Sequence, residues 1–386
     1  MDGELWTNET EFDEMDEEAW SNFSAAINES FSFSEMSTVH LYYYYLWTYV
    51  APALLGSITV IGTIGNSLVI YVICSGKVRT TITNILLLNL AITDIAFLLI
   101  CVPFKAHKYA ATSWDLGVAV CKATQYLAYV SSYVTVWSLV SISAIRFVTV
   151  VLSAKIFTKR NVAIVICLIW GVSLLANIPA ITTHVLKSIG VYTYCGMKPG
   201  STETVFVTYF LFAYALPLLI ICILYILIMI HLQRATNKAQ SVKSQMQGRT
   251  AKACKVIITV VLMFAISWLP YHVNILVGVY GKLPAGAYYE AFRVLWDCMA
   301  YSNSCVNPII YNYVSNDFKK AFKQCVSCWR NRDSTQPEQQ RLAQQTQMTK
   351  MSVQMHVCRT ALPVFMLSSH KLNADDVDDD QTPLND

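Results

Sequence analysis

Seven long stretches of apolar residues set the pattern of this chain. Each is about 20 residues long or longer, the length of helix needed to cross the roughly 30 Å hydrocarbon layer of a membrane. Apolar and polar residues do not alternate within them as in barrel strands, so each stretch is predicted to be a helix. The pattern therefore predicts an all-α membrane protein, a seven-transmembrane helix bundle. The stretches are residues 47–74, 84–106, 122–146, 161–185, 203–231, 255–280 and 292–313, within a bundle of residues 47–313.

A short amphipathic helix is predicted directly after the seventh stretch, over residues 314–328. The run Ser315-Asn316-Asp317 supplies a cap and an acid for its first turn. Phe318 and Phe322 share one face of this helix and have lysines beside them. We expect this eighth helix to lie on the cytoplasmic surface of the membrane, in contact with membrane lipid.

Charge distinguishes the two ends of the bundle. Lys and Arg are concentrated in one set of loops, with Lys77, Lys159 and Lys319 among them, which places that set in the cytoplasm. Residues 1–46 then form an extracellular acidic tail, and residues 329–386 form a polar cytoplasmic tail that is predicted to be disordered. Glycosylation of the first tail is predicted from three N-x-S/T sequences, at Asn8, Asn22 and Asn28.

Composition excludes several classes of function. Hydrophobic residues make up 55% of the chain and charged residues 14%, against about 25% charged residues in a soluble domain. The sequence offers no basic face on a soluble fold, so we expect no nucleic-acid partner. It also has no nucleotide-binding loop, metal-spaced His/Cys set or nucleophile–base arrangement, so we do not expect an enzyme. A membrane transporter is a remote alternative, against which the absence of an internal repeat counts.

Short motifs occur in order along the seven stretches. They are Gly65-Asn66, the run from Asn89 to Asp94, Cys121, Trp170, Pro217, Tyr225, Phe264, Trp268, Pro270 and the run Asn307-Pro308-Ile309-Ile310-Tyr311. With these motifs the chain resembles the rhodopsin-class G-protein-coupled receptors over roughly residues 45 to 328. The resemblance implies a multi-pass plasma-membrane receptor with its N-terminus outside the cell.

The resemblance also implies roles for individual residues. Cys121 and Cys195 would form a disulfide that ties the second outer loop to the third helix. Cys325 and Cys328, after the eighth helix, stand where members of the family carry palmitate, although free cytosolic thiols are the alternative. Residues that would change arrangement on activation are Arg146, Tyr225, Phe264, Trp268, Pro270, Asn307, Pro308 and Tyr311.

Asp94 is an ionisable residue in the middle of the second stretch, where such residues are costly and usually functional. It is either a structural hydrogen-bond hub or, as the resemblance implies, the acid of an allosteric sodium site. Oxygen atoms for such a hard cation could come from Asp94, Thr135, Asn303 and Asn307. No other cofactor is expected.

One departure from the family pattern lies at the cytoplasmic end of the third stretch. The family has an acid before Arg146, but here Ile145 occupies that position. Neither Arg249 nor Lys252, near the start of the sixth stretch, can replace the missing carboxylate. We therefore expect raised basal signalling, and a constitutively signalling orphan receptor is the main alternative function.

The nature of the ligand follows from a few positions. The family's amine receptors have an Asp where Ala128 stands, and its retinal pigments have a Lys where Tyr301 stands, so neither ligand is expected. The outer half of the bundle instead carries polar-tipped aromatic residues and a few charges, which suit a peptide. The predicted ligand-binding residues are Gln125, Tyr129, Tyr209, Tyr271, His272, Asn274, Arg293, Trp296, Asp297 and Tyr301.

Within the family, several runs resemble the allatostatin-A and galanin receptor group. They include Val102-Pro103-Phe104, Trp268-Leu269-Pro270-Tyr271-His272 and Ala300-Tyr301-Ser302-Asn303. The resemblance implies a receptor for an extracellular neuropeptide that activates a heterotrimeric G protein, of the inhibitory type. It also implies that arrestin and a receptor kinase bind the C-terminal tail.

Overall fold

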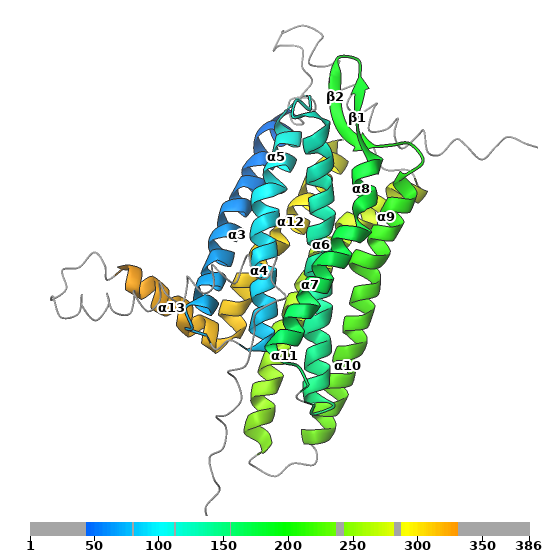
Figure 1. Cartoon of the computed structure of the whole chain (residues 1–386). Helices are drawn as coiled ribbons and strands as arrows, with labels where there is room; N and C mark the ends of the chain where they lie inside the picture. The colour runs from blue at the N-terminus through cyan, green and yellow to red at the C-terminus, as the bar shows by residue number, and fades with distance from the viewer. Residues whose placement is uncertain are drawn as a thin grey trace, which may run out of the picture. The chain divides into compact units, whose positions relative to one another are not determined.

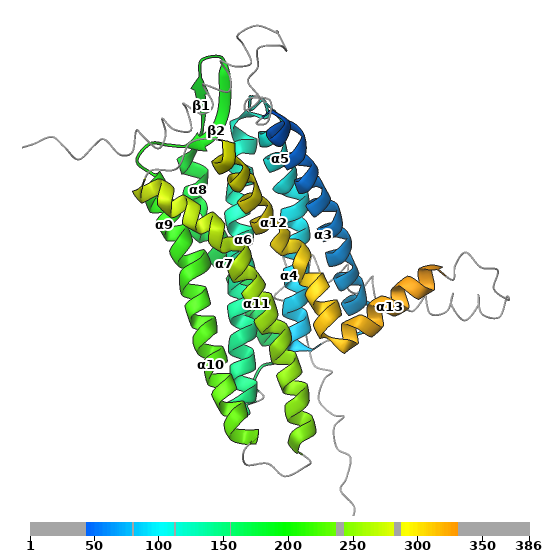
Figure 2. The same cartoon turned by 180° about the vertical axis from the view of Figure 1, so that it is seen from behind.

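Long helices packed side by side form the core of the molecule (Figures 1 and 2). The structure is a computed structural model that describes residues 44–78, 81–111, 113–154, 156–236, 243–281 and 287–330, which all belong to one compact unit within Met1–Ser334. Its helices are η1 (Leu46–Val50), α3 (Ala51–Cys74), α4 (Ile82–Ile100), α5 (Val102–Ala110), α6 (Gly117–Val150), α7 (Lys159–Ala176), α8 (Ile178–Thr183), α9 (Thr202–Phe210), η2 (Leu211–Ala215), α10 (Leu216–Thr236), α11 (Lys243–Tyr280), α12 (Ala287–Val314) and α13 (Asn316–Arg330).

Four of the predicted spans are each built from consecutive helical pieces, and the first consists of the π-helical segment η1 followed by α3. The second span breaks between α4 and α5, just before Pro103, and the fourth breaks between α7 and α8, just before Pro179. In the fifth span, the π-helical segment η2 separates α9 from α10, just before Pro217. Proline lacks the N–H of an ordinary helical residue and its ring crowds the preceding turn, so a break or bulge at these positions is the expected consequence.

Six helical spans in the described part of the chain are long and apolar enough to cross a membrane. The seventh helix, α12, has the length but carries polar and charged residues, including Arg293, Asp297, Asn303 and Asn307. These side chains are at most partly exposed, so α12 can lie in the bundle with its polar face inward. Seven helical spans with one polar member agree with the predicted bundle.

Polar residues lie inside the bundle and many large apolar residues face outward. Asn66, Asn89 and Asp94 are at most 7% exposed, whereas Ile64 and Leu175 are 65% and 69% exposed. A lipid environment accounts for this inversion, because apolar side chains can face hydrocarbon while buried polar groups must find partners within the protein. The outward apolar surface therefore supports the assignment as a membrane protein.

The eighth helix, α13, leaves the end of α12 at a steep angle (Figure 1). It begins two residues later than predicted and extends to Arg330. Phe318 and Phe322 are buried, and the Phe318 ring lies 5.6 Å from the ring of Tyr311 in α12. Lys319 and Lys320 are exposed, so the predicted amphipathic character is present.

A two-stranded hairpin that the sequence analysis did not predict stands at the opposite end of the bundle (Figures 1 and 2). It consists of β1 (His184–Ile189) and β2 (Tyr192–Met197), which pair in antiparallel register. Gly190, in the two-residue turn, has a φ of +56°, a conformation that glycine adopts readily. The hairpin belongs to the loop between α8 and α9 and lies next to the N-terminal end of α6.

Candidate functional site

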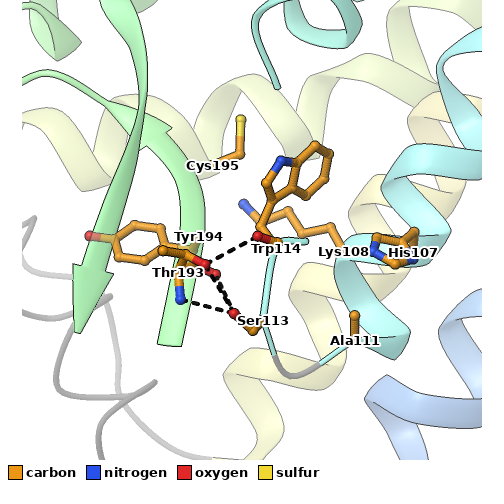
Figure 3. A pocket seen from close by; sticks show the side chains of 8 residues that line it. All are labelled: His107, Lys108, Ala111, Ser113, Trp114, Thr193, Tyr194 and Cys195. Atoms are coloured by element: carbon orange, nitrogen blue, oxygen red, sulfur yellow. Dashed lines mark hydrogen bonds between the residues drawn. The ribbon is translucent and has the colours of Figure 1, made fainter. Parts of the chain in front are cut away.

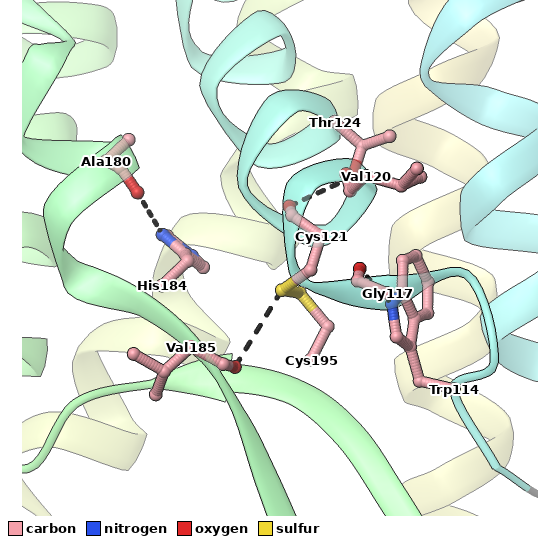
Figure 4. The surroundings of a disulfide bond; sticks show 9 residues. All are labelled: Trp114, Gly117, Val120, Cys121, Thr124, Ala180, His184, Val185 and Cys195. Atoms are coloured by element: carbon pink, nitrogen blue, oxygen red, sulfur yellow. Dashed lines mark hydrogen bonds between the residues drawn. A yellow bond between two sulfur atoms is a disulfide. The ribbon is translucent and has the colours of Figure 1, made fainter.

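The predicted disulfide between Cys121 and Cys195 is present (Figure 4). Cys121 lies in the first turns of α6 and Cys195 lies on β2, with their Cα atoms 5.6 Å apart. Both residues are buried, and the Cys121 Sγ atom lies 3.8 Å from the carbonyl oxygen of Val185 on β1. The bond therefore fixes the hairpin to the outer end of the third span.

His184, the first residue of β1, makes a second connection between the hairpin and the bundle. Its ring Nδ1–H donates to the carbonyl of Ala180 at 2.8 Å (Figure 4), and its ring centroid lies 6.0 Å from that of Tyr129. Burial lowers the pKa of His184 below its usual 6.5, and the nearby Lys108 ammonium acts in the same direction, against the opposing effect of the Ala180 hydrogen bond. The ring is therefore neutral at physiological pH.

The loop between α5 and α6 is bonded to the outer edge of β2. The Trp114 N–H donates to the carbonyl of Thr193 at 2.6 Å, and the Thr193 N–H donates to the Ser113 hydroxyl at 3.0 Å. Figure 3 shows these residues beside a depression with about 260 Å³ of empty space that opens to solvent. The depression is shallow and lies outside the helix bundle, so we do not place the main ligand site there. Its lining residues are His107, Lys108, Ala111, Ser113, Trp114, Thr193, Tyr194 and Cys195.

Four of the predicted ligand-binding residues meet in one aromatic cluster between α6, α9, η2 and α11. The centre of the cluster is His272, which is 2% exposed. Its ring centroid lies 5.2 Å from Tyr209, 4.6 Å from Tyr214 and 5.7 Å from Tyr271. Tyr129 completes the group, with its ring 4.8 Å from that of Tyr209. Ring pairs at these distances stabilise one another, so the cluster joins three of the spans.

The aromatic cluster is continuous with the predicted activation residues of α11. The Trp268 ring lies 6.0 Å from that of His272, and the Phe264 ring lies 6.1 Å from that of Trp268. Pro270 lies inside α11 between Trp268 and His272. A displacement of His272 would therefore be passed directly to the residues beside the proline.

A second group of predicted residues surrounds Asp297 in α12. The Lys105 ammonium lies 2.8 Å from the Asp297 carboxylate, which also accepts a hydrogen bond from the Tyr109 hydroxyl. Asp297 is 5% exposed, and the Lys105 ammonium balances its charge while the neutral Tyr109 hydroxyl adds a hydrogen bond. The sequence analysis had placed Asp297 in the ligand site but missed Lys105 and Tyr109. The sequence does contain a clue, because the i,i+4 spacing of Lys105 and Tyr109 places both on one face of the helix that follows Pro103. An acid within a membrane helix needs a partner, and these two residues could supply it.

Arg293 and Tyr301 extend this second group along α12. The Arg293 guanidinium stacks over the Trp47 ring at 4.7 Å, and the Trp47 ring lies 4.8 Å from that of Tyr109. Tyr301 lies 5.3 Å from Phe97 of α4. Trp47, on η1, was not predicted as a site residue. The π-helical segment η1 thus brings the start of the first span into contact with the second and seventh spans.

The remaining predicted ligand-binding residues do not join either group. The Asn274 side chain accepts a hydrogen bond from Tyr289 at 2.8 Å, and Trp296 stacks on Phe292, which is 52% exposed. Gln125 is partly exposed in α6. The structure therefore brings together seven of the ten residues, in two neighbouring sets, and leaves these three at the margin.

Buried polar side chains connect the spans in the middle of the bundle. Asp94 accepts a hydrogen bond from the Asn307 amide at 2.9 Å, which joins α4 to α12. Asn66 donates to the Ser304 carbonyl at 2.7 Å, and Asn89 accepts from the Trp170 indole at 3.0 Å. These contacts tie the first, second, fourth and seventh spans together, and Asp94 itself connects the second span to the seventh.

The predicted oxygen donors for a sodium ion are all buried, and they are Asp94, Thr135, Asn303 and Asn307. One carboxylate with neutral hydroxyl and amide oxygens is a chemically suitable set for a hard cation. The Asn307 nitrogen faces Asp94 in this arrangement, so Asn307 would offer its oxygen only after its amide group turned.

Arg146 lies near the C-terminal end of α6, far along the helix from Cys121. Among the described residues, the buried Arg146 Nε atom and the hydroxyls of Tyr225 and Tyr311 have no hydrogen-bond partner. Ile145 is 5% exposed and packs in the apolar core. The side chains of Arg249 and Lys252 lie outside the described residues.

Some of the modification sites also fall outside the described residues, namely Asn8, Asn22, Asn28 and the side chain of Cys328. Cys325 is partly buried, and both Cys325 and Cys328 lie within α13, which extends to Arg330, and not after the helix as predicted. The Lys77 ammonium, from the turn after α3, lies 3.5 Å from the Cys325 sulfur.

Comparison with known proteins identifies the class of this molecule. The family of 7 transmembrane receptors, rhodopsin family, matches residues 65–311. The chain belongs to this family, and it is therefore a multi-pass receptor of the plasma membrane and not an enzyme.

Several members of the family are similar over most of their length. Human galanin receptor type 1 is 35% identical over 302 residues, which cover 74% of this chain and 84% of that receptor. Galanin receptor 2b of Danio rerio is 35% identical over 277 residues, covering 70% and 73% of the two chains. The allatostatin-A receptor of Bombyx mori is 31% identical over 294 residues, covering 72% and 80%.

Proposed function

We propose that this receptor binds an extracellular neuropeptide of the galanin or allatostatin-A kind and passes the signal to a heterotrimeric G protein of the inhibitory type. The observation that carries the proposal is the buried aromatic cluster around His272, which lies at the outer half of the bundle and touches Trp268. The names of the similar receptors support a peptide of this group.

The cluster suits an aromatic peptide side chain. Tyr129, Tyr209 and Tyr271 present large ring surfaces whose hydroxyl groups can donate or accept hydrogen bonds. An inserted ring would displace His272 and, through it, Trp268. Because Pro270 interrupts the hydrogen-bond ladder of α11, the helix can change its bend there at low cost.

At the cytoplasmic end, a change in the bend of α11 would alter the surroundings of Arg146. The partnerless polar groups of Arg146, Tyr225 and Tyr311 could then gain hydrogen bonds that they lack in this arrangement. Such a gain would favour the conformation that engages the G protein. We propose that arrestin and a receptor kinase act on the cytoplasmic tail, and that Cys325 and Cys328 carry palmitate.

The orientation and the sodium site are part of the same proposal. The N-terminal tail lies outside the cell, glycosylated at Asn8, Asn22 and Asn28. A sodium ion held by Asp94, Thr135 and Asn303 would stabilise the resting arrangement, since a rearranged hub would lose oxygen ligands.

Raised basal signalling is a second candidate property, favoured by the unpaired Arg146 Nε atom and by Ile145. An Arg–carboxylate pair at a partly dry helix end biases a two-state equilibrium by on the order of 1 kcal/mol. We expect Ile145→Asp to lower agonist-free G-protein activation several-fold at matched surface density while leaving the agonist response. Basal activity equal to that of empty cells, unchanged by Ile145→Asp, would refute this property.

The main test is to apply galanin and allatostatin-A peptides to cells that express the chain, with cAMP and calcium as readouts. We expect agonist to lower cAMP and His272→Ala to reduce potency by about tenfold or more, as at a binding hot spot. Val273→Ala is the matched control, because Val273 is the next residue and is 49% exposed. Activation by none of the peptides would refute the proposed ligand, and equal potency of the two variants would refute the proposed site.

A further inference from the structure

The turn after α3 holds one lysine in a defined position. The chain reverses at Gly76, whose φ of +70° is the left-handed conformation that commonly ends a helix. The N–H of the buried Val78 then donates to the carbonyl of Val72 at 3.4 Å and closes the turn. Lys77 lies between these two anchored residues, and its ammonium lies 5.5 Å from the centre of the Tyr71 ring. The backbone therefore sets the start of this side chain, and the ring holds its charged end.

The neighbour of this ammonium is Cys325 on α13, a helix that lies beside the C-terminal end of α3 (Figures 1 and 2). Cys325 follows the buried residues Ala321 and Phe322 on the same face of α13. Its Sγ atom lies 3.5 Å from the Lys77 Nζ atom. Because two separate helices position the amine and the thiol, their contact follows from the packing of α13 against the bundle.

Both groups are available for chemistry. Within the described part of the chain, Lys77 forms no ion pair with a carboxylate, so no acid holds its amine in the charged form. Cys325 is a partly exposed free thiol. An acyl group attached to this sulfur would therefore lie within reach of an amine.

We propose that Lys77 is a site of fatty acylation, which receives its acyl chain from Cys325 by transfer from sulfur to nitrogen. The inference rests on the proposed function, because Cys325 must first carry palmitate. In that first step, a long-chain acyl-CoA thioester passes its acyl group to the Cys325 sulfur and releases free coenzyme A. The transfer to Lys77 then takes place within the receptor.

The transfer balances without an oxidant or a second acyl donor. The neutral Lys77 Nζ atom attacks the carbonyl carbon of the Cys325 thioester, so that a C–N bond forms and the C–S bond breaks. The electron pair of the C–S bond leaves with the sulfur, which takes up the proton lost by the nitrogen. The products are a fatty amide on Lys77 and a free thiol on Cys325. The reaction runs forward because an amide is more stable than a thioester.

The short separation of the two atoms favours this reaction over direct acylation. The thioester carbonyl carbon is bonded to Sγ, so Nζ can approach it to about 3–3.5 Å, the range of near-attack geometries. A lysine side chain is mostly protonated at neutral pH. A neighbouring group can, however, act at an effective concentration of about 10⁵ M or more, which offsets the small neutral fraction. Exposed lysines such as Lys320 should therefore react far more slowly.

The main test uses the purified full-length receptor in detergent, incubated with palmitoyl-CoA and then treated with neutral hydroxylamine, which cleaves thioesters and spares amides. Peptide mass spectrometry would locate the remaining acyl groups. We expect an amide on Lys77 in the wild type and in Cys328→Ser, the matched control, and about tenfold less or lower still in Cys325→Ser. Lys77→Arg keeps the positive charge and should carry the acyl group on Cys325 only as a thioester.

A second measurement follows the reaction in cells without added acyl-CoA. Cells that express the receptor would be labelled with a palmitate analogue, and the receptor would be isolated and treated with hydroxylamine. We expect the wild type to keep a resistant share of the label and Lys77→Arg to lose this share.

Two results would overturn the inference while leaving the proposed palmitate in place. One is a thioester on Cys325 without an amide on Lys77 in the wild type. The other is an equal amount of amide on Lys77 in the wild type and in Cys325→Ser, because acylation would then be direct. If Cys325 carries no acyl group in Lys77→Arg, palmitate on Cys325 is refuted and this inference fails with it.

Discussion

Gly62 offers a sharp test of how closely the first, second and seventh spans pack. A β-carbon added at Gly62 would lie 2.5 Å from the Leu98 Cδ1 atom and 2.7 Å from the Cys305 Sγ atom. Non-bonded carbon atoms prefer about 3.5–4.0 Å, so Gly62→Ala requires one or both neighbours to move by roughly 1 Å. Leu98 is fully buried and Cys305 donates its S–H to the Ile58 carbonyl at 2.9 Å, which limits such movement.

The expected magnitude is a balance of two terms. Inserting a methyl group into a well-packed core costs about 1–3 kcal/mol, and replacing a helical glycine by alanine returns up to about 1 kcal/mol. Gly56→Ala should show the second term alone, because nothing lies within 4 Å of a β-carbon there. The difference between the two variants should therefore be about 1–3 kcal/mol in the free energy of unfolding.

The assay is thermal unfolding of the receptor in detergent, with both variants purified in parallel. A loss of 1 kcal/mol lowers the midpoint by roughly 2–4 °C for a chain of this order of size. Gly62→Ala should thus melt several degrees below Gly56→Ala, and Cys305→Ala should restore part of the loss because it removes one of the two atoms in the way. A Gly62→Ala variant as stable as Gly56→Ala would show that the three helices are not packed this closely.

Three further predictions concern the outer half of the receptor. Asp297→Asn leaves the Lys105 ammonium without its carboxylate and should reduce surface expression or agonist potency by about tenfold. Leu295→Ala, at a 49% exposed position of the same helix, should change neither. Equal behaviour of the two variants would refute a role for the ion pair. Burial lowers the pKa of His184, so the unfolded chain binds this proton more readily, and the contribution of neutral His184 to stability is present above about pH 6.5 and is lost as the pH falls below it. His184→Gln should flatten this part of the pH dependence of thermal stability, and an unchanged slope would contradict the assignment. Cys121→Ser should abolish surface expression or peptide binding, and normal affinity at normal expression would show the disulfide to be dispensable.

The sequence predicted the parts of the fold that depend on periodicity and composition. Long apolar stretches have few alternatives in a membrane, so the spans and the face of α13 that buries Phe318 were predictable. The ends of the helices were less predictable, since α11 begins at Lys243, 12 residues before the predicted apolar stretch. That part of the helix is polar, and hydropathy does not report it.

The hairpin and the contacts between spans could not be predicted in the same way. The β1 and β2 strands are short, and their pairing depends on the disulfide and on a loop more than 70 residues away in sequence. The spacing of Lys105 and Tyr109 places both on one face of a helix, but it does not indicate that they reach Asp297 in another span. Contacts of this kind depend on how helices rotate against one another, which a single sequence does not state.

The disulfide between Cys121 and Cys195 has a consequence for biogenesis. The two cysteines lie 74 positions apart in the sequence, and the segment between them includes most of α6, all of α7 and α8, and β1. The ribosome must therefore synthesise the third and fourth spans and the hairpin before the thiols can meet. Once the bond has formed, Cys121 is fully buried and Cys195 is 4% exposed. Cellular reductants can therefore reach these thiols only during a limited time. That time begins when the third span has been synthesised and ends when the hairpin has been joined to it.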